Sequence, residues 1–168
     1  LSAYGEALTQ QERIEAEIAK LKGIIGDVIY SLEDDTLENC IGKLLSKHGK
    51  TLSTAESCTG GMISSLITSV PGSSEYFLGS VTSYANGVKE NVLGVPAEII
   101  AEHGAVSSEC VAAMAEGVRR ITSSDYSVAT SGIAGPGGGT SEKPVGLVWI
   151  AVSSENGTET FSHVFKNN

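Results

Sequence analysis

The sequence predicts an α/β fold, a three-layer α/β/α sandwich around a mostly parallel, mixed sheet with at least one antiparallel strand. Three observations lead to this prediction. Segments with helical apolar spacing alternate with short apolar runs typical of buried strands. Glycine-rich turns follow two of these runs, where α/β sheets commonly bind ligands. The dipeptide Asn156-Gly157 predicts a tight hairpin between the last two strands, which makes that pair antiparallel.

The expected elements follow one another without an internal repeat. The strands are short apolar runs at residues 51–55, 76–84, 126–131, 145–153 and 158–165. The helices are expected at residues 6–23, after Asp35, at residues 62–70 and 86–93, from Pro96, and after a cap at Ser107 or Ser108. Asp35 and Glu38 also fit an N-terminal capping box.

Composition and charge exclude several classes of protein. Acidic residues outnumber basic ones by 20 to 11, and the resulting net charge of −9 repels nucleic acid and anionic membranes. No apolar run approaches the ~20 residues that span a bilayer. The cysteines and histidines are scattered, which disfavours a disulfide framework or a metal site. We therefore expect a cytoplasmic protein that uses no metal or other cofactor and contacts neither nucleic acid nor membrane.

A turn at residues 54–61 (TAESCTGG) joins a strand to a helix. A helix N-terminus presents unpaired N–H groups to an anion, and adjacent glycines allow a phosphate to approach the backbone. Glu56 is expected to orient a ligand amide or a ribose hydroxyl. The alternative is an ordinary capped helix start, and these residues alone favour neither reading. The expected ligand-binding residues of this turn are Glu56, Ser57, Thr59, Gly60 and Gly61.

A second glycine-rich loop occupies residues 132–139, with five glycines among eight residues. Glycines in left-handed conformations build anion-binding concavities. The loop is neither a dinucleotide fingerprint nor a P-loop, because no Gly-Lys-Ser/Thr follows it. A flexible connection is the alternative, but Pro136 and the flanking apolar strands favour a binding loop. Its expected substrate-binding residues are Ser131, Gly132 and Gly135.

A third group of residues suggests hydrolysis. A desolvated lysine loses its proton more readily and can activate a serine hydroxyl, while a tyrosine can relay the proton. Ser73, Ser74, Tyr84 and Lys89 supply these groups, although from the residues alone turn, core and surface roles are the better explanation. Cys58 is an alternative nucleophile, because a helix N-terminus lowers the pKa of a thiol.

Taken together, the motifs resemble the C-terminal domain of the competence/damage-inducible protein CinA, a nicotinamide mononucleotide amidohydrolase family. The matching segments are TAESCTGG at residues 54–61, PGSS at 71–74, VTSYANGVK at 81–89, HGAVS at 103–107 and SGIAGP at 131–136. The resemblance implies hydrolysis of the carboxamide of nicotinamide mononucleotide to nicotinic acid mononucleotide and ammonia. It also implies Ser74, Tyr84 and Lys89 as the catalytic residues, with the choice between Ser73 and Ser74 open.

The resemblance also implies a domain organisation. Residues 1–35 would form a helical connector to an N-terminal molybdopterin-binding-like domain, and residues 36–168 the amidohydrolase domain, with a terminal helix following Asn168. We further expect a homo-oligomer. The competing hypotheses are a non-catalytic nucleotide-sensing or assembly domain and a cysteine amidase that uses Cys58.

Overall fold

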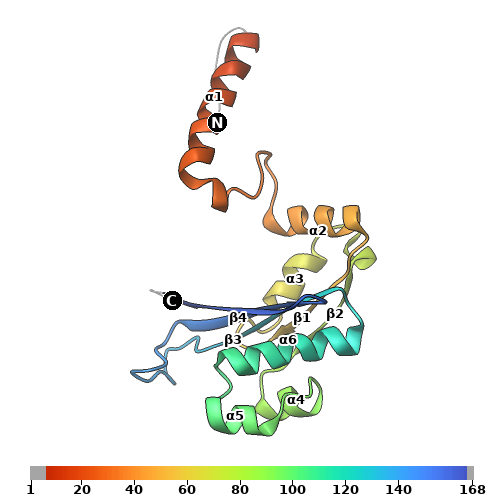
Figure 1. The fold of residues 1–168 in the computed structure, drawn as a ribbon, viewed down its shortest axis with the longest axis vertical. Helices are drawn as coiled ribbons and strands as arrows, with labels where there is room; N and C mark the ends of the chain where they lie inside the picture. Colours follow the sequence, from red (N-terminus) through yellow and green to blue (C-terminus); the bar gives the residue numbers. More distant parts are fainter. Residues whose placement is uncertain (1–6, 166–168) are drawn as a thin grey trace. The chain divides into compact units, whose positions relative to one another are not determined.

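The computed structural model describes residues 7–165 of the chain (Figure 1). It divides into two compact units, Leu1–Cys40 and Ile41–Asn168. The elements of the first unit are helix α1 (Ala7–Ile25), the 3-10 helix η1 (Gly26–Val28) and the start of helix α2 (Leu37–His48). No described helix has the length and apolar character needed to cross a membrane.

Helix α2 begins one residue later than the capping-box pattern indicates. The hydroxyl of Thr36 accepts a hydrogen bond from the N–H of Asn39 over 3.4 Å, and the Thr36 carbonyl accepts one from the N–H of Cys40. Thr36 therefore makes the capping contact that the sequence pattern assigned to Asp35.

The second unit is built on a five-stranded mixed sheet in the order β2-β1-β3-β4-β5. Its strands are β1 (Leu52–Glu56), β2 (Phe77–Thr82), β3 (Tyr126–Gly132), β4 (Leu147–Ser154) and β5 (Gly157–Val164). Strand β1 pairs in parallel with β2 and β3, whereas β4 is antiparallel to both β3 and β5. The predicted mixed α/β sheet is confirmed, and the Asn156-Gly157 hairpin joins the expected antiparallel pair.

The connections between the parallel strands diverge at the carboxyl end of β1. One connection runs through α3 (Met62–Thr68) to β2 on one side of β1. The next runs to β3 on the other side through α4 (Asn86–Asn91), α5 (Ala97–His103) and α6 (Ser108–Thr122). Open α/β sheets bind ligands in the crevice outside the carboxyl ends of the strands at such a point. The topology therefore predicts a ligand site at the carboxyl ends of β1 and β3.

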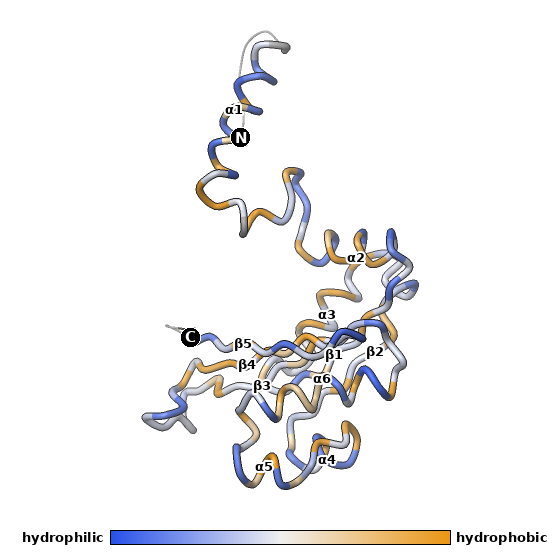
Figure 2. Tube along the Cα trace, in the orientation of Figure 1, coloured by the Kyte–Doolittle hydropathy of each residue, from blue (hydrophilic) through white to orange (hydrophobic). Residues whose placement is uncertain are grey.

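Helices cover both faces of β1, which is buried along its whole length. Successive side chains of a strand point to opposite faces, so each face needs its own apolar partner. On one face, the buried side of α6 packs against the strands through Val111, Met114, Val118, Ala55, Ala129 and Ala151. On the other, α2 and α3 contribute to a cluster of Ile41, Leu45, Ile63, Ile67, Leu52 and Tyr76. Figure 2 shows the matching alternation of hydrophobic and hydrophilic residues along α2.

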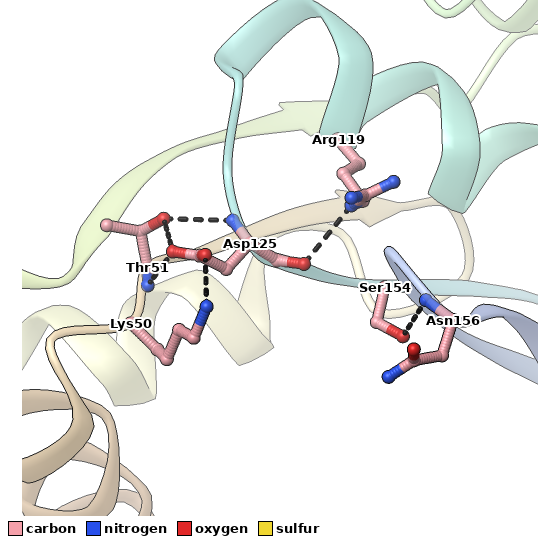
Figure 3. A network of polar contacts seen from close by, with 6 residues as sticks. All are labelled: Lys50, Thr51, Arg119, Asp125, Ser154 and Asn156. Carbon is pink, nitrogen blue, oxygen red and sulfur yellow. Dashed lines mark hydrogen bonds and ion pairs between the residues drawn. The ribbon is translucent and has the colours of Figure 1, made fainter.

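A polar network joins the amino ends of β1 and β3 (Figure 3). The Asp125 carboxylate accepts hydrogen bonds from the Thr51 N–H at 2.9 Å, the Thr51 hydroxyl at 2.8 Å and the Lys50 ammonium at 2.8 Å. Arg119 Nε of α6 donates to the Asp125 carbonyl over 3.1 Å. This network anchors the two strands and the last turn of α6 to one another.

Candidate active site

A cavity of about 320 Å³ lies at the carboxyl ends of β1 and β3. Its walls come from the turn after β1, the start of α4, the turn between α5 and α6, and the glycine-rich loop after β3. The residues that line it include Ser57, Cys58, Tyr84, Asn86, Lys89, Ala105, Val106, Ser131, Gly132 and Gly135. The fold therefore gathers, in one cavity, segments that are far apart in the sequence.

Lys89 of α4 is the most unusual group in this cavity, because its side chain is only 1% exposed. Its Nζ lies 3.1 Å from the Ser57 Oγ, 2.6 Å from the Ser83 carbonyl oxygen and 3.3 Å from the Tyr84 carbonyl oxygen. Within residues 7–165, no acidic side chain forms an ion pair with it. A buried ammonium with only neutral partners is poorly compensated.

The surroundings of Lys89 disfavour the charged ammonium relative to an exposed lysine. Burial lowers the pKa of the Lys89 ammonium, and the nearby Cys110 and Cys58 thiols only partly oppose this effect. A neutral amine has two N–H donors and one lone pair. The Ser83 and Tyr84 carbonyls can only accept hydrogen bonds, so they take the two donors. In the structure Lys89 Nζ donates to the Ser57 hydroxyl as well; in the neutral amine the lone pair would instead accept the proton of that hydroxyl.

Ser57 follows the last residue of β1 and is held from two directions. Its N–H donates to the Thr130 carbonyl of β3 over 3.0 Å, and its hydroxyl contacts Lys89. The residue is 8% exposed but lines the cavity, so the hydroxyl is shielded from bulk water and still reachable by a ligand. A serine and a lysine so arranged can carry out nucleophilic attack on an acyl carbon.

The glycine-rich loop forms the opposite wall, as the sequence predicted for Ser131, Gly132 and Gly135. A Cβ on Gly132 would lie 2.7 Å from the Leu147 carbonyl oxygen and 3.1 Å from the Cys58 Sγ, so only glycine fits there. The Ser131 hydroxyl donates to the Ala105 carbonyl over 2.7 Å. Among residues 7–165, no acceptor is bonded to the N–H groups that follow in this wall, those of Ala134, Gly135, Gly137 and Gly138.

Comparison with known proteins identifies the family and the fold. The family model described as the CinA C-terminal domain matches residues 34–168. The chain belongs to the CinA C-terminal domain family. It is 47% identical over 159 residues to a putative competence-damage inducible protein of Desulforudis audaxviator, covering 94% of this chain and 38% of that protein. It is 52% identical over 147 residues to a CinA-like protein of Parasynechococcus marenigrum, covering 88% and 35%.

Solved structures of CinA-type proteins have the same fold. The competence/damage inducible protein from Agrobacterium tumefaciens is 41% identical, with a TM-score of 0.72 over 76% of each chain. A CinA superfamily protein from Escherichia coli is 30% identical, with a TM-score of 0.76 over 86% of this chain and 87% of that one. The chain spans less than half the length of the two curated relatives named above, and it covers three quarters or more of these solved chains.

In this CinA domain, the serine beside Lys89 is Ser57 and not the predicted Ser74. Ser74 lies exposed in the 3-10 helix η2 (Ser73–Glu75), before the amino end of β2. Lys89 follows the carboxyl end of the same strand, and six strand residues extend about 20 Å. Within one copy of the chain, Ser74 is therefore separated from the lysine. The resemblance assigned the serine to the PGSS turn before β2, whereas the structure places the serine of the turn after β1 beside the lysine.

Glu56 has a structural role instead of the predicted contact with a ligand. Its fully buried carboxylate accepts hydrogen bonds from the N–H groups of Gly61 at 3.2 Å, Ile63 at 2.9 Å and Ser64 at 2.8 Å. Burial by itself would raise the pKa of Glu56, but the Ser64 and Ile63 N–H groups outweigh it and lower the pKa. The amino terminus of α3 is therefore already occupied by an anion from the same chain.

The predicted phosphate site at this turn is corrected for the same reason. Gly60 and Gly61 do not line the cavity, and the Gly61 N–H is bonded to Glu56. The Thr59 hydroxyl lies 2.8 Å from that of Thr130, which ties the turn to β3. Of the five ligand-binding residues expected here, only Ser57 reaches the cavity.

Tyr84 and Cys58 also line the cavity, but their surroundings differ from what the sequence suggested. The Tyr84 side chain is 77% exposed at the rim, and its carbonyl, not its hydroxyl, contacts Lys89. Burial raises the pKa of the Cys58 thiol, which disfavours the thiolate that a cysteine nucleophile requires. Asn86 also lines the cavity and was missed, although its position inside the 81–89 segment was an available signal.

Proposed function

We propose that this domain hydrolyses the carboxamide of nicotinamide mononucleotide to nicotinic acid mononucleotide and ammonia. The observation that carries the proposal is the 3.1 Å contact between Ser57 Oγ and the buried Lys89 Nζ at the carboxyl end of β1. A hydroxyl that donates to a neutral amine in a shielded cavity is a nucleophile suited to an acyl carbon. The resemblance to the CinA amidohydrolases supports the choice of substrate.

The proposed reaction proceeds through an ester of Ser57. The Ser57 Oγ bonds to the carboxamide carbon while Lys89 Nζ takes the hydroxyl proton. Lys89 then gives this proton to the amide nitrogen, the C–N bond breaks, and ammonia leaves. A water molecule, deprotonated by Lys89, attacks the ester carbon, the proton passes from Lys89 to Ser57 Oγ as the ester bond breaks, and the released nicotinic acid group gives its own proton to ammonia, which leaves a carboxylate and ammonium.

The glycine-rich loop would hold the charged parts of the substrate. Lys89 is the only basic side chain among the residues that line the cavity within the described part of the chain. The backbone N–H groups of Ala134, Gly135, Gly137 and Gly138 are therefore the proposed donors to the 5′-phosphate. Tyr84 is placed to contact the substrate at the rim of the cavity.

Ammonia release from nicotinamide mononucleotide, measured with the full-length protein, tests the proposal. We expect Ser57→Ala to lower kcat by about 10³-fold or more, since the nucleophile is lost. Ser74→Ala is the matched control, and its activity should stay within about twofold of the wild type because the residue lies outside the cavity. The reverse ranking of the two variants would refute the assignment of Ser57.

Two other outcomes identify the competing functions. Saturable binding of nicotinamide mononucleotide by the wild-type protein without ammonia release would favour a nucleotide-sensing domain. Loss of activity in Cys58→Ala with retention in Ser57→Ala would favour a cysteine amidase.

A further inference from the structure

The turn between α5 and α6 forms one wall of the cavity through Ala105 and Val106. Gly104 in this turn has a φ of +78° and a ψ of +165°, a conformation that essentially only glycine adopts. Three consecutive carbonyl oxygens of the turn each accept a hydrogen bond from a side chain. The donors are Lys143 Nζ to His103 at 2.5 Å, Ser107 Oγ to Gly104 at 2.8 Å and Ser131 Oγ to Ala105 at 2.7 Å.

Lys143 differs from the other two donors in its position in the chain. Ser107 caps the helix that follows the turn, and Ser131 lies in β3. Lys143 belongs to the segment that continues the glycine-rich loop toward β4. A turn fixes its backbone, because the Thr140 N–H donates to the Lys143 carbonyl over 2.8 Å and the Lys143 N–H to the Thr140 hydroxyl over 3.0 Å. The ammonium of Lys143 therefore connects two walls of the cavity.

Few other hydrogen bonds tie the glycine-rich loop to the rest of the described chain. At its base, the Ile133 N–H donates to the Leu147 carbonyl, and the Ile133 carbonyl accepts a hydrogen bond from the Gly146 N–H. Of residues 134–145, only Lys143 and Pro144 make a hydrogen bond to a residue outside this segment within the described chain, to His103 and Leu147 respectively. Pro144 bonds to Leu147 beside the base, so the Lys143 bond to His103 is the one that secures the loop away from its base.

We propose that Lys143 is a positioning residue, whose bond to the His103 carbonyl holds the glycine-rich loop against the α5–α6 turn and sets the width of the substrate cavity. Lys143 does not line this cavity and touches none of the groups assigned to the reaction. The effect of Lys143 on the width of the cavity is inferred from the position of this hydrogen bond and does not depend on the proposed function. Its effect on turnover rests on the proposed function.

The extent to which iodoacetamide alkylates Cys58 measures how open the cavity is, and this readout does not require the proposed hydrolysis. Cys58 is half-buried between the two walls, and Cys40, outside the cavity, is an internal reference within the same protein. Lys143→Met keeps an unbranched side chain of similar length but removes the donor, and Lys143→Arg keeps a charged donor. Lys47→Met, at an exposed position of α2, is the matched control.

We expect the ratio of Cys58 to Cys40 alkylation, read by peptide mass spectrometry, to rise about tenfold in Lys143→Met, the factor for one charge-assisted hydrogen bond. Lys143→Arg and Lys47→Met should stay close to the wild type. An unchanged or lower ratio in Lys143→Met overturns the proposal. So does an equal increase in Lys143→Arg, because the bond would then not be the cause.

Kinetics separate this proposal from the proposed function. With nicotinamide mononucleotide as substrate, Lys143→Met should raise KM by about tenfold and change kcat by less than about threefold, because the loop contacts the bound ligand and not the reacting bond. If alkylation responds as expected but the wild type releases no ammonia, the proposed function fails and the role of Lys143 in shaping the cavity stands. A fall in kcat alone, with KM and alkylation unchanged, refutes the positioning role.

Discussion

Two lysines at opposite ends of β1 have opposite electrostatic surroundings. Lys50, before the strand, donates to the Asp125 carboxylate, and this bond and the charge of Asp125 raise the pKa of the lysine (Figure 3). Lys89, beyond the other end, has only neutral hydrogen-bond partners, and burial lowers its pKa. The charged form of the same side chain is thus favoured by a carboxylate in one place and disfavoured by burial in the other.

Exchanging each lysine for methionine should separate the two roles most strongly. We expect Lys89→Met to lower kcat for ammonia release by about 10³-fold, because the base is lost. Lys50→Met should keep kcat within about twofold of the wild type but lower the melting temperature, since the Asp125 network loses a donor. Paired activity assays and thermal melts measure both effects. Equal losses of activity would contradict the contrast between the two ends of the strand.

A carboxylate placed beside Lys89 should raise the pKa of this lysine, as Asp125 raises that of Lys50. Cys58→Asp introduces such a group, and Cys58→Asn is the neutral control of the same size. Because only the neutral amine can accept the Ser57 proton, kcat/KM should rise with pH through the Lys89 pKa in the wild type. A neighbouring negative charge raises that pKa, so Cys58→Asp should move the rising limb by about one pH unit upward, or more, relative to Cys58→Asn. Coincident profiles would count against Lys89 as the base.

Glu56 tests whether the turn after β1 is structural. We expect Glu56→Gln to lower the free energy of unfolding by about 2 kcal/mol, because a buried carboxylate that caps a helix is lost. The folded-state pKa of Glu56 is lowered, so its contribution is present above the unfolded pKa and is lost as the pH falls through the folded one. Urea titrations near pH 7 and pH 3 measure the difference. An increase in KM without a loss of stability would restore Glu56 as a ligand-binding residue.

Substitution of Asp125 should have the smallest effect on stability, because its contacts with Lys50 and Thr51 are partly exposed to solvent. Its bonds to Lys50 and Thr51 lower its pKa from 3.8 to about 2. The stabilisation is fully present above the unfolded pKa and is lost as the pH falls through about 2. Asp125→Asn should lower the melting temperature near pH 7, and its deficit relative to the wild type should shrink toward pH 2. A deficit that does not depend on pH would exclude the charge as its source.

The elements of the fold could be predicted more completely than the contacts of the site. Apolar runs and turn residues located each strand to within a few residues, since periodicity and turn chemistry are local properties. The five glycines identified the loop after β3, and the resemblance to the CinA family identified Lys89. The pairing of Lys89 with Ser57 depends on β1 lying beside β2, and no local pattern reports which strands become neighbours.

By itself, the sequence determined the α/β class, the positions of the glycine-rich turns and the presence of a lysine in a motif suited to hydrolysis. Only the tertiary structure decided that Ser57 and not Ser74 meets this lysine, and that Glu56 occupies the helix terminus where an anion was expected. The physical reason is that the charge state and the reactivity of a side chain depend on burial and on partners within a few ångströms. These partners are brought together by strand order, across more than thirty residues of sequence in the case of Ser57 and Lys89.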